Sequence, residues 1–323
     1  MPSELPWHNP TALIINGVGD HLIALPAVRA LSTLMRGRLR LLCLPSAREL
    51  FFSDLTFAAV HNVDLDESSA GQTKDYRHYV VEPLAAAIGD CDLFLSFERQ
   101  SSPSTAALLR TLRPKESIGF LPEFDVEIPF SSTAHASDLA FAIPKQLAPA
   151  LRIEDFACPP QLPDAVLALT GKLRADLPRN SVLLAVHAET KPDKTWSSIK
   201  LTEVLNELLA LHRHLIVVTV GVAPFAFDVG RSRARLLCCH GVPLTVALSV
   251  IGACDLFLGI DSCMLHMADL SRVPSVGLFG PTKPAEFGFR FARHVHMSAP
   301  TMDQISVAEV LDALQKLWTS EFA

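Results

Sequence analysis

The stretch GIDSCMLHMADL combines residue types that could hold a negatively charged ligand. Asp261 and Ser262 follow the apolar run DLFLGI and stand where the N-caps of helices are found. The helix that they would start leaves the backbone N–H groups of Cys263 and Met264 without partners inside the helix. Because such a helix start binds anions, the pattern predicts an anion site, most naturally for phosphate.

Three further side chains could serve the same anion. His266 falls in or near the first turn of this helix and could donate to it, or could instead be satisfied against neighbouring loops. Lys191 and Lys194 lie in ETKPDKTW, an irregular polar segment after the strand-like SVLLAVHA. Lysine binds phosphate as a mobile point charge, although lysines on such a loop are also commonly just solvated.

A second polar turn, NGVGDHLIALP, follows the first apolar strand. Its glycines Gly17 and Gly19 resemble a dinucleotide fingerprint, but Leu22 stands where the third glycine is needed, and the next strand, RLRLLCLP, lacks a terminal acid to bind a ribose. We therefore expect no nicotinamide or flavin cofactor. Asp20 is placed immediately ahead of a helix, where it is either a simple N-cap or a general base facing a cleft between two domains.

A third turn, LFGPTKPAEFG, contains Gly280, Pro281 and Thr282 after an apolar strand. Glycine and proline here predict a rigid turn, which needs no functional explanation.

These turns need a scaffold that brings strand ends together. Short apolar runs alternate with amphipathic segments along the chain, which predicts an α/β fold of parallel sheets covered on both faces. The proline-rich segment ACPPQLPDAV predicts a boundary between two doubly wound domains, residues 1–162 and 163–323. The last segment, ISVAEVLDALQKLW, predicts an amphipathic helix that closes the structure or packs back on the first domain.

Composition limits the classes of function. The 323 residues are 49% hydrophobic and carry a net charge of −6, which argues against a nucleic-acid partner. No apolar run is long enough to span a membrane and the first residues do not resemble a signal peptide, so we expect a soluble, cytoplasmic protein. The seven cysteines are scattered without C-x-x-C spacing, which predicts reduced thiols and no zinc site.

The order of the motifs resembles that of the ADP-heptose:lipopolysaccharide heptosyltransferases, glycosyltransferase family 9. That family shows a G-x-G-D opening followed by an apolar run ending in proline, a K-x-W loop, and D-[ST]-G-x-x-H-x-x-A followed by a strand and F-G-P-T. This chain has NGVGDHLIALP, KPDKTW and GIDSCMLHMADLSRVPSVGLFGPTKP in that order. The C-terminal block is the most specific part of the resemblance.

The resemblance implies a GT-B architecture, with two Rossmann-like domains facing each other across a cleft. The first would bind the hydroxyl acceptor, and the second the nucleoside-diphosphate sugar, with ADP-heptose as the expected donor. It also implies inverting transfer without an essential metal or other cofactor, in a cytoplasmic enzyme able to work at the inner face of a membrane.

The resemblance also assigns roles to residues. Asp20 would be the general base. The donor diphosphate would be held by the following residues: Lys194, Asp261, Ser262, Cys263, Met264 and His266. The residues expected to line the cleft are Gly17, Gly19, His21, Lys191, Gly280, Pro281 and Thr282.

Two departures from the family bear on the donor. Cys263 replaces the glycine of D-[ST]-G, where a side chain can crowd a phosphate unless it points away; a thiolate would repel the donor, so we expect the thiol. The family's ribose-binding glutamate is missing from GVAPFAFDVGRSRAR, which has no glutamate before Asp228. The arginines of this segment could contact phosphate or lie on a solvated loop: Arg231, Arg233 and Arg235.

The acceptor is constrained by charge. Residues 1–165 contain 13 Lys and Arg against 20 Asp and Glu, whereas an anionic lipopolysaccharide core would favour a basic acceptor domain. We therefore expect a neutral or cationic acceptor, such as a small metabolite or an aminated sugar. Two alternatives stay open: a catalytically silent member of the fold that binds a nucleotide or a partner, and an epimerase that needs no acceptor.

Overall fold

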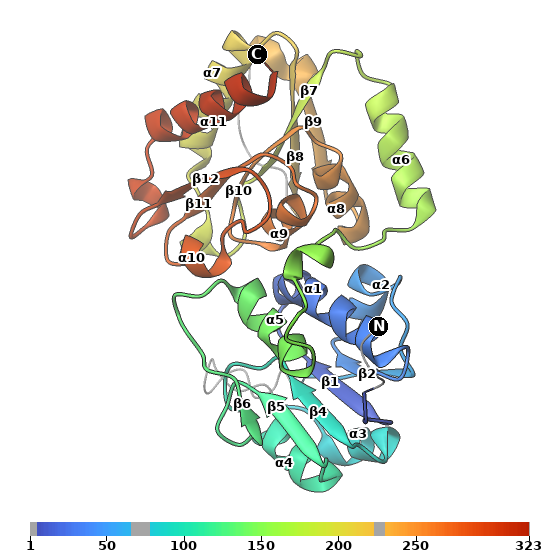
Figure 1. Ribbon diagram of the computed structural model, residues 1–323. Coiled ribbons are helices and arrows are strands. Elements are labelled where there is room, and N and C mark those ends of the chain that lie inside the picture. The colour runs from blue at the N-terminus through green and yellow to red at the C-terminus, as the bar shows by residue number, and fades with distance from the viewer. Residues whose placement is uncertain (1–4, 66–77, 223–229, 323) are drawn as a thin grey trace. The chain divides into compact units, whose positions relative to one another are not determined.

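The computed structural model describes residues 5–65, 78–222 and 230–322 (Figure 1). The chain forms two compact units, Met1–Gln161 and Leu162–Ala323. Strands and helices alternate in both, which confirms the expected α/β class. The boundary expected after residue 162 lies one residue beyond this division.

The first unit is built on a six-stranded parallel sheet in the order β3-β2-β1-β4-β5-β6. Its strands are β1 (Pro10–Ile14), β2 (Arg40–Cys43), β3 (Ala59–Asn62), β4 (Leu93–Ser96), β5 (Glu116–Gly119) and β6 (Val126–Glu127). Its helices are α1 (Val18–Met35), α2 (Ala47–Phe51), α3 (Val81–Ile88), α4 (Pro103–Leu112) and α5 (Ala136–Leu147), followed by the short 3-10 helix η2 (Ile153–Asp155). Leu13 packs toward α3 and α4, whereas Ile14 faces α1 and α5, so β1 is buried on both faces.

The second unit repeats this plan in the order β12-β11-β10-β7-β8-β9. Its strands are β7 (Val182–His187), β8 (Leu215–Gly221), β9 (Leu236–His240), β10 (Leu256–Ile260), β11 (Ser275–Phe279) and β12 (His294–Ser298). Its helices are α6 (Asp164–Ala175), α7 (Ser198–Leu211), α8 (Leu244–Gly252), α9 (Cys263–Leu270), α10 (Pro284–Phe287) and α11 (Val307–Phe322), with the 3-10 helices η3 (Pro192–Lys194), η4 (Gly230–Arg235) and η5 (Met302–Gln304). Helices α7 and α11 share one hydrophobic core with the sheet, and α8 packs on α6 and α9.

The strand order reverses once in each sheet, and these reversals position the polar loops. In the first unit the chain runs outward from β1 through β2 to β3 and then returns to the other side of β1 as β4. In the second unit β10 returns beside β7 in the same way. The loops leaving β1 and β4, and those leaving β7 and β10, therefore diverge at a switch point, where open α/β sheets bind their ligands.

The start of α1 differs from the expectation. The helix begins at Val18 with Gly17 as its N-cap, so Asp20 lies inside the first turn rather than ahead of the helix. The Asp20 carboxylate still accepts the Gly17 N–H, at 2.9 Å, and so closes a capping box. A glycine at the N-cap and an acid three residues later together explain the early start.

The last helix, α11, belongs to the second unit, where it packs on α7 and beside β11 and β12. It starts with a capping box in which Ser306 Oγ accepts the Glu309 N–H at 3.3 Å and Glu309 accepts the Ser306 N–H at 3.1 Å. The Ser306 hydroxyl, which donates to Glu309 Oε2 at 2.5 Å, and the Ser306 N–H lower the pKa of Glu309. The buried face of α11 supplies Val310, Leu314 and Leu317 to the core.

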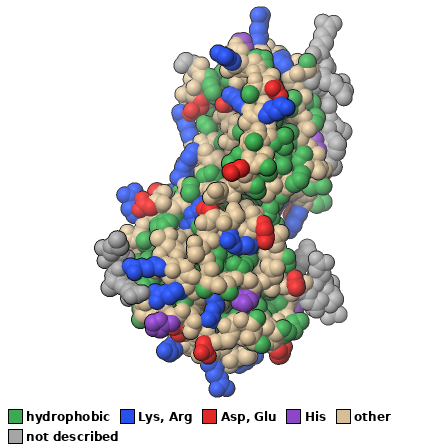
Figure 2. All heavy atoms as spheres, turned by 90° about the vertical axis from the view of Figure 1, so that its right-hand side faces the viewer, with side chains coloured by type: hydrophobic (Ala, Val, Ile, Leu, Met, Phe, Trp, Pro, Cys, Tyr) green, Lys and Arg blue, Asp and Glu red, His purple; other side chains and the backbone are tan. Residues whose placement is uncertain are grey.

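All seven cysteines are free thiols, as expected. Within the described parts of the chain, no helix has the length and apolar character needed to cross a membrane. On the face seen in Figure 2, acidic and basic side chains are interspersed with hydrophobic ones rather than gathered into one basic patch.

Candidate functional site

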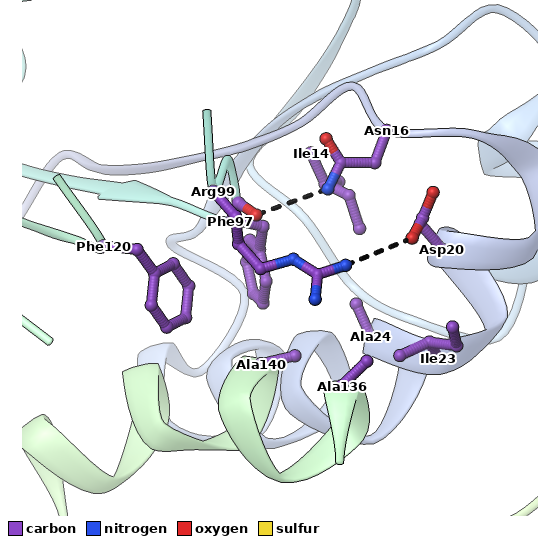
Figure 3. Close-up of a pocket in the computed structure, with 10 residues that line it drawn as sticks. All are labelled: Ile14, Asn16, Asp20, Ile23, Ala24, Phe97, Arg99, Phe120, Ala136 and Ala140. Carbon is purple, nitrogen blue, oxygen red and sulfur yellow. Dashed lines mark hydrogen bonds and ion pairs between the residues drawn. The ribbon is translucent and has the colours of Figure 1, made fainter. Parts of the chain in front are cut away.

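Asp20 stands at the switch point of the first unit. Its Oδ2 accepts the Gly17 N–H, which fixes the carboxylate beside the end of β1. Across from it, Arg99 follows β4, and Arg99 Nη2 lies 3.6 Å from Asp20 Oδ1 (Figure 3). The Arg99 side chain is 20% exposed, and the Asp20 side chain is 31% exposed. A carboxylate and a guanidinium therefore face each other where β1 and β4 end.

Arg99 was not among the site residues predicted from the sequence. The signal for it was its place directly after the apolar strand DLFLSFE, because residues at the carboxyl ends of parallel strands are candidates for function. The adjacency of β1 and β4 brings it to Asp20, and the Asn16 side-chain amide adds a hydrogen bond to the Phe97 carbonyl at 3.4 Å.

The pair lines a small pocket of about 20 Å³. This volume suits about one water molecule or one hydroxyl group. The remaining walls are Ile14, Asn16, Ile23, Ala24, Phe97, Phe120, Ala136 and Ala140. Apart from Asn16, these remaining side chains are apolar. Few other polar groups in the pocket therefore compete with the Asp20 carboxylate for a hydroxyl that donates its proton.

His21, which was predicted to line the cleft, is a buried residue of the first unit. His21 is only 1% exposed, its Nδ1 lies 2.9 Å from the Gly17 carbonyl oxygen, and its ring stacks on Phe51. One residue along a helix is a turn of about 100°, so Asp20 and His21 cannot share a face. Gly17 and Gly19 are half-buried at the start of α1.

The second unit brings three of the predicted donor-binding residues into one cluster. Lys194 Nζ donates to Asp261 Oδ2 at 2.5 Å, and His266 Nε2 lies 3.8 Å from Asp261 Oδ1. Asp261 and His266 are buried, whereas Lys194 remains 23% exposed. The ammonium of Lys194 therefore sits between a buried carboxylate and solvent.

Trp196 explains how the loop holds Lys194 in place. Its indole is buried in the core of the second unit, and its Nε1–H donates to the Ile305 carbonyl at 3.4 Å. Its backbone N–H donates to the Ala188 carbonyl at 3.1 Å. The 3-10 turn η3 then directs Lys194 back toward β10. Lys191, predicted beside it, is exposed.

The start of α9 offers polar groups to a ligand. Ser262 is the N-cap but makes no capping hydrogen bond, and its buried hydroxyl has no hydrogen-bond partner among the described residues. Cys263 and Met264 open the helix, so their N–H groups are the terminal donors. Burial raises the pKa of the Cys263 thiol to about 11, which confirms the expected thiol form.

The turn after β11 lies beside this helix start because β10 and β11 are paired. A Cβ at Gly280 would come within 2.9 Å of the Met302 backbone nitrogen, so this position requires glycine. Beyond it, the buried Thr282 hydroxyl also lacks a hydrogen-bond partner among the described residues, and Pro281 is exposed.

Arg235 is bound to the end of α7. Its guanidinium donates to the carbonyls of Leu209 and His212, at 2.6 and 2.8 Å, and so closes the end of α7. Asp228 and the side chains of Arg231 and Arg233 lie outside the part of the chain that the structure describes.

Within the described ranges, no three His, Cys, Asp or Glu side chains come together as ligands for a metal ion.

Several solved structures share the fold of this chain. The chain is 16% identical to a family 9 glycosyltransferase from Veillonella parvula, with a TM-score of 0.77 over 98% of this chain and 99% of that one. It is 17% identical to E. coli ADP-heptose lps heptosyltransferase II (TM-score 0.66, covering 97% and 100%) and 16% identical to E. coli heptosyltransferase WaaC with ADP (TM-score 0.65, covering 95% and 99%). At these identities the likeness establishes the fold. No curated protein matches the sequence.

The two six-stranded parallel sheets form the GT-B fold that the similar solved structures share. The sequence model of glycosyltransferase family 9 (heptosyltransferase) matches residues 84–313, which is well over half of the chain. The chain therefore belongs to glycosyltransferase family 9, and the resemblance drawn from its motifs is confirmed.

Proposed function

We propose that this enzyme transfers a heptose or a related sugar from a nucleoside-diphosphate sugar, ADP-heptose in the first place, to a hydroxyl of a neutral or cationic acceptor. The acceptor binds the first unit and the donor the second. The transfer inverts the anomeric centre and uses no essential metal. The free thiols suit an enzyme of the reducing cytoplasm.

The observation that carries the proposal is the cluster at the start of α9. Lys194 is paired with Asp261, which directly precedes Ser262 and the first N–H groups of α9, and the buried Ser262 hydroxyl has no hydrogen-bond partner among the described residues. A departing nucleoside diphosphate gains negative charge as its bond to the sugar breaks. Fixed donors aimed at that charge stabilise the transition state more than the ground state.

Asp20 is the proposed general base. The acceptor hydroxyl gives its proton to the carboxylate while its oxygen attacks the anomeric carbon, and the bond from that carbon to the diphosphate oxygen breaks. The diphosphate takes the electron pair of this bond. One displacement of this kind inverts the configuration, and the pocket beside Asp20 has room for about one hydroxyl group.

The proposed donor and the proposed acceptor are supported by different observations. Two of the similar structures are an ADP-heptose lps heptosyltransferase and a heptosyltransferase with ADP, which supports an ADP-sugar donor here. The acidic excess of the first 165 residues, 13 Lys and Arg against 20 Asp and Glu, supports an acceptor without negative charge.

One alternative has its own support. The Lys194 ammonium is already paired with Asp261, and the Cys263 sulfur lies against the N–H groups of Cys263 and Met264. Both features would suit a catalytically silent protein that binds a nucleotide weakly or binds a partner instead.

A thermal-shift panel with ADP, GDP, UDP and their sugars tests the proposal. A ligand that binds only the folded state adds about 2.7 kcal/mol at a hundredfold excess over Kd. We expect ADP and ADP-heptose to stabilise the protein most, and failure of every nucleotide to do so would refute the donor assignment.

Turnover separates the enzyme from the silent alternative. With ADP-heptose and candidate acceptors, the wild type should release ADP, and Asp20→Ala should abolish release while leaving the affinity for ADP nearly unchanged. Full turnover by Asp20→Ala would show that Asp20 is not the base, and stabilisation without any turnover would favour the silent alternative.

A further inference from the structure

The two carboxylate oxygens of Asp20 have different surroundings. Oδ2 accepts the Gly17 N–H at 2.9 Å and is committed to the cap of α1. Oδ1 faces the pocket and Arg99. If Asp20 takes a proton from the acceptor, as proposed above, Oδ1 is therefore the oxygen that receives it.

Arg99 lies at a distance suited to orienting Oδ1 without occupying it. The separation of 3.6 Å between Nη2 and Oδ1 is longer than a direct N–H···O hydrogen bond. The attraction between the charges still holds the carboxylate toward the pocket, while a lone pair on Oδ1 remains open to a hydroxyl. In Figure 3 the guanidinium points at Asp20 across the pocket, from the opposite side of the switch point.

Stability alone does not account for this pair. Both side chains are partly exposed, and exposed ion pairs contribute about 0–1 kcal/mol. The cap bond to Gly17 already fixes the other oxygen of Asp20 without help from Arg99. The pair does stand at the switch point, where orientation of a carboxylate matters for function.

We propose that Arg99 is the positioning residue of the general base: its guanidinium directs Oδ1 of Asp20 at the acceptor hydroxyl and keeps a positive charge beside the oxygen that attacks. This inference rests on the proposed function. It adds a residue that acts through Asp20, and it predicts a loss of turnover without a loss of donor binding, because the donor-binding residues belong to the second unit.

The test compares Arg99→Met and Arg99→Lys with the wild type, using ADP release from ADP-heptose at a saturating concentration of an acceptor that the wild type accepts. A misplaced reacting group costs on the order of 100-fold in rate, so we expect a loss of that order in kcat for Arg99→Met. The Kd for ADP and the melting temperature should stay unchanged. Arg99→Lys keeps the charge but not the planar fork, so it should recover part of the loss.

Arg110→Met is the matched control, because Arg110 is an exposed arginine on α4 of the same unit. It removes the same charge and should keep the kcat of the wild type. A loss in Arg110→Met equal to that in Arg99→Met would show that the net charge of the unit matters rather than the pair, and would overturn the inference.

A double-mutant cycle with Asp20→Asn decides whether Arg99 acts through Asp20. Asparagine preserves an oxygen for the Gly17 N–H but cannot take the proton, so Arg99→Met should cost nothing more in that background. An equal loss in both backgrounds, or an unchanged kcat in Arg99→Met alone, would overturn the inference. A wild type that releases no ADP with any acceptor would instead refute the proposed function on which the inference rests.

Discussion

Replacing Lys194 by methionine should affect stability and donor binding separately. The ammonium lies 2.5 Å from Asp261, whose side chain is 8% exposed. Removing one partner of a buried pair costs about 3–5 kcal/mol, and the partial exposure of Lys194 lowers our expectation to about 2–3 kcal/mol. Loss of a charged hydrogen bond to the diphosphate, at about 1.5–3 kcal/mol, should weaken ADP binding about 10- to 100-fold.

Asp261→Asn is the matched variant, and it should not weaken the affinity for ADP. It removes the carboxylate that holds the ammonium and leaves Lys194 available to the diphosphate, so ADP should bind as tightly as to the wild type or more tightly. The double variant Lys194→Met/Asp261→Asn should recover stability relative to Lys194→Met, because it contains no buried carboxylate without its cation.

Two measurements check these expectations. Urea unfolding followed by tryptophan fluorescence in a Trp7→Phe background, which leaves Trp196 and Trp318 as the emitters, reports on the second unit, and calorimetric titration with ADP gives the affinity. An unchanged Kd in Lys194→Met would refute the assignment of Lys194 to the diphosphate. Weakening in Asp261→Asn as severe as in Lys194→Met would show that Asp261 supports the donor directly and does not compete with it.

Three further changes test other parts of the structure. Gly280→Ala should destabilise the second unit by about 1–3 kcal/mol, because the new Cβ would meet Met302 at 2.9 Å; an unchanged urea midpoint would contradict this. Cys263, with a thiol pKa of about 11, should react with iodoacetamide at pH 8 far more slowly than the exposed Cys158, as measured by peptide mass spectrometry, and equal rates would reveal a thiolate. Burial lowers the pKa of His187 below its ordinary 6.5, so the unfolded chain binds this proton first and stability should fall as pH drops below about 6.5. Urea unfolding across that range should show a shallower decline in His187→Gln, and a parallel decline would assign the effect to other groups.

The second unit was the easier one to predict from sequence. DLFLGI followed by Asp261 and Ser262 contains both the apolar strand and the polar cap, so local pattern alone places α9 and its N-terminal groups. The pairing of Lys194 with Asp261 was not predicted, since it depends on β7 and β10 being neighbours in the sheet. Strand order is a long-range property that motifs close in sequence do not contain.

The first unit shows two errors with physical causes. A glycine N-cap gives a weak signal, so the start of α1 was placed too late; in the helix as it forms, the His21 ring stacks on Phe51. Arg99 was missed because its importance comes from a contact with Asp20 across two strands that the sequence separates widely.

The same topology supports different chemistry in the two units because the acidic residue stands on different sides of the N-cap. In α1 Asp20 lies three residues after the cap and its own carboxylate takes the Gly17 N–H, so an anion approaching this helix start would meet negative charge. In α9 Asp261 precedes the cap and turns to Lys194, and Ser262 makes no capping bond. At the start of α9 the neutral Cys263 thiol lies against the N–H groups of Cys263 and Met264, whereas in α1 the carboxylate itself is presented. The place of one aspartate relative to the helix start thus supports the proposed division, with proton transfer in the first unit and diphosphate binding in the second.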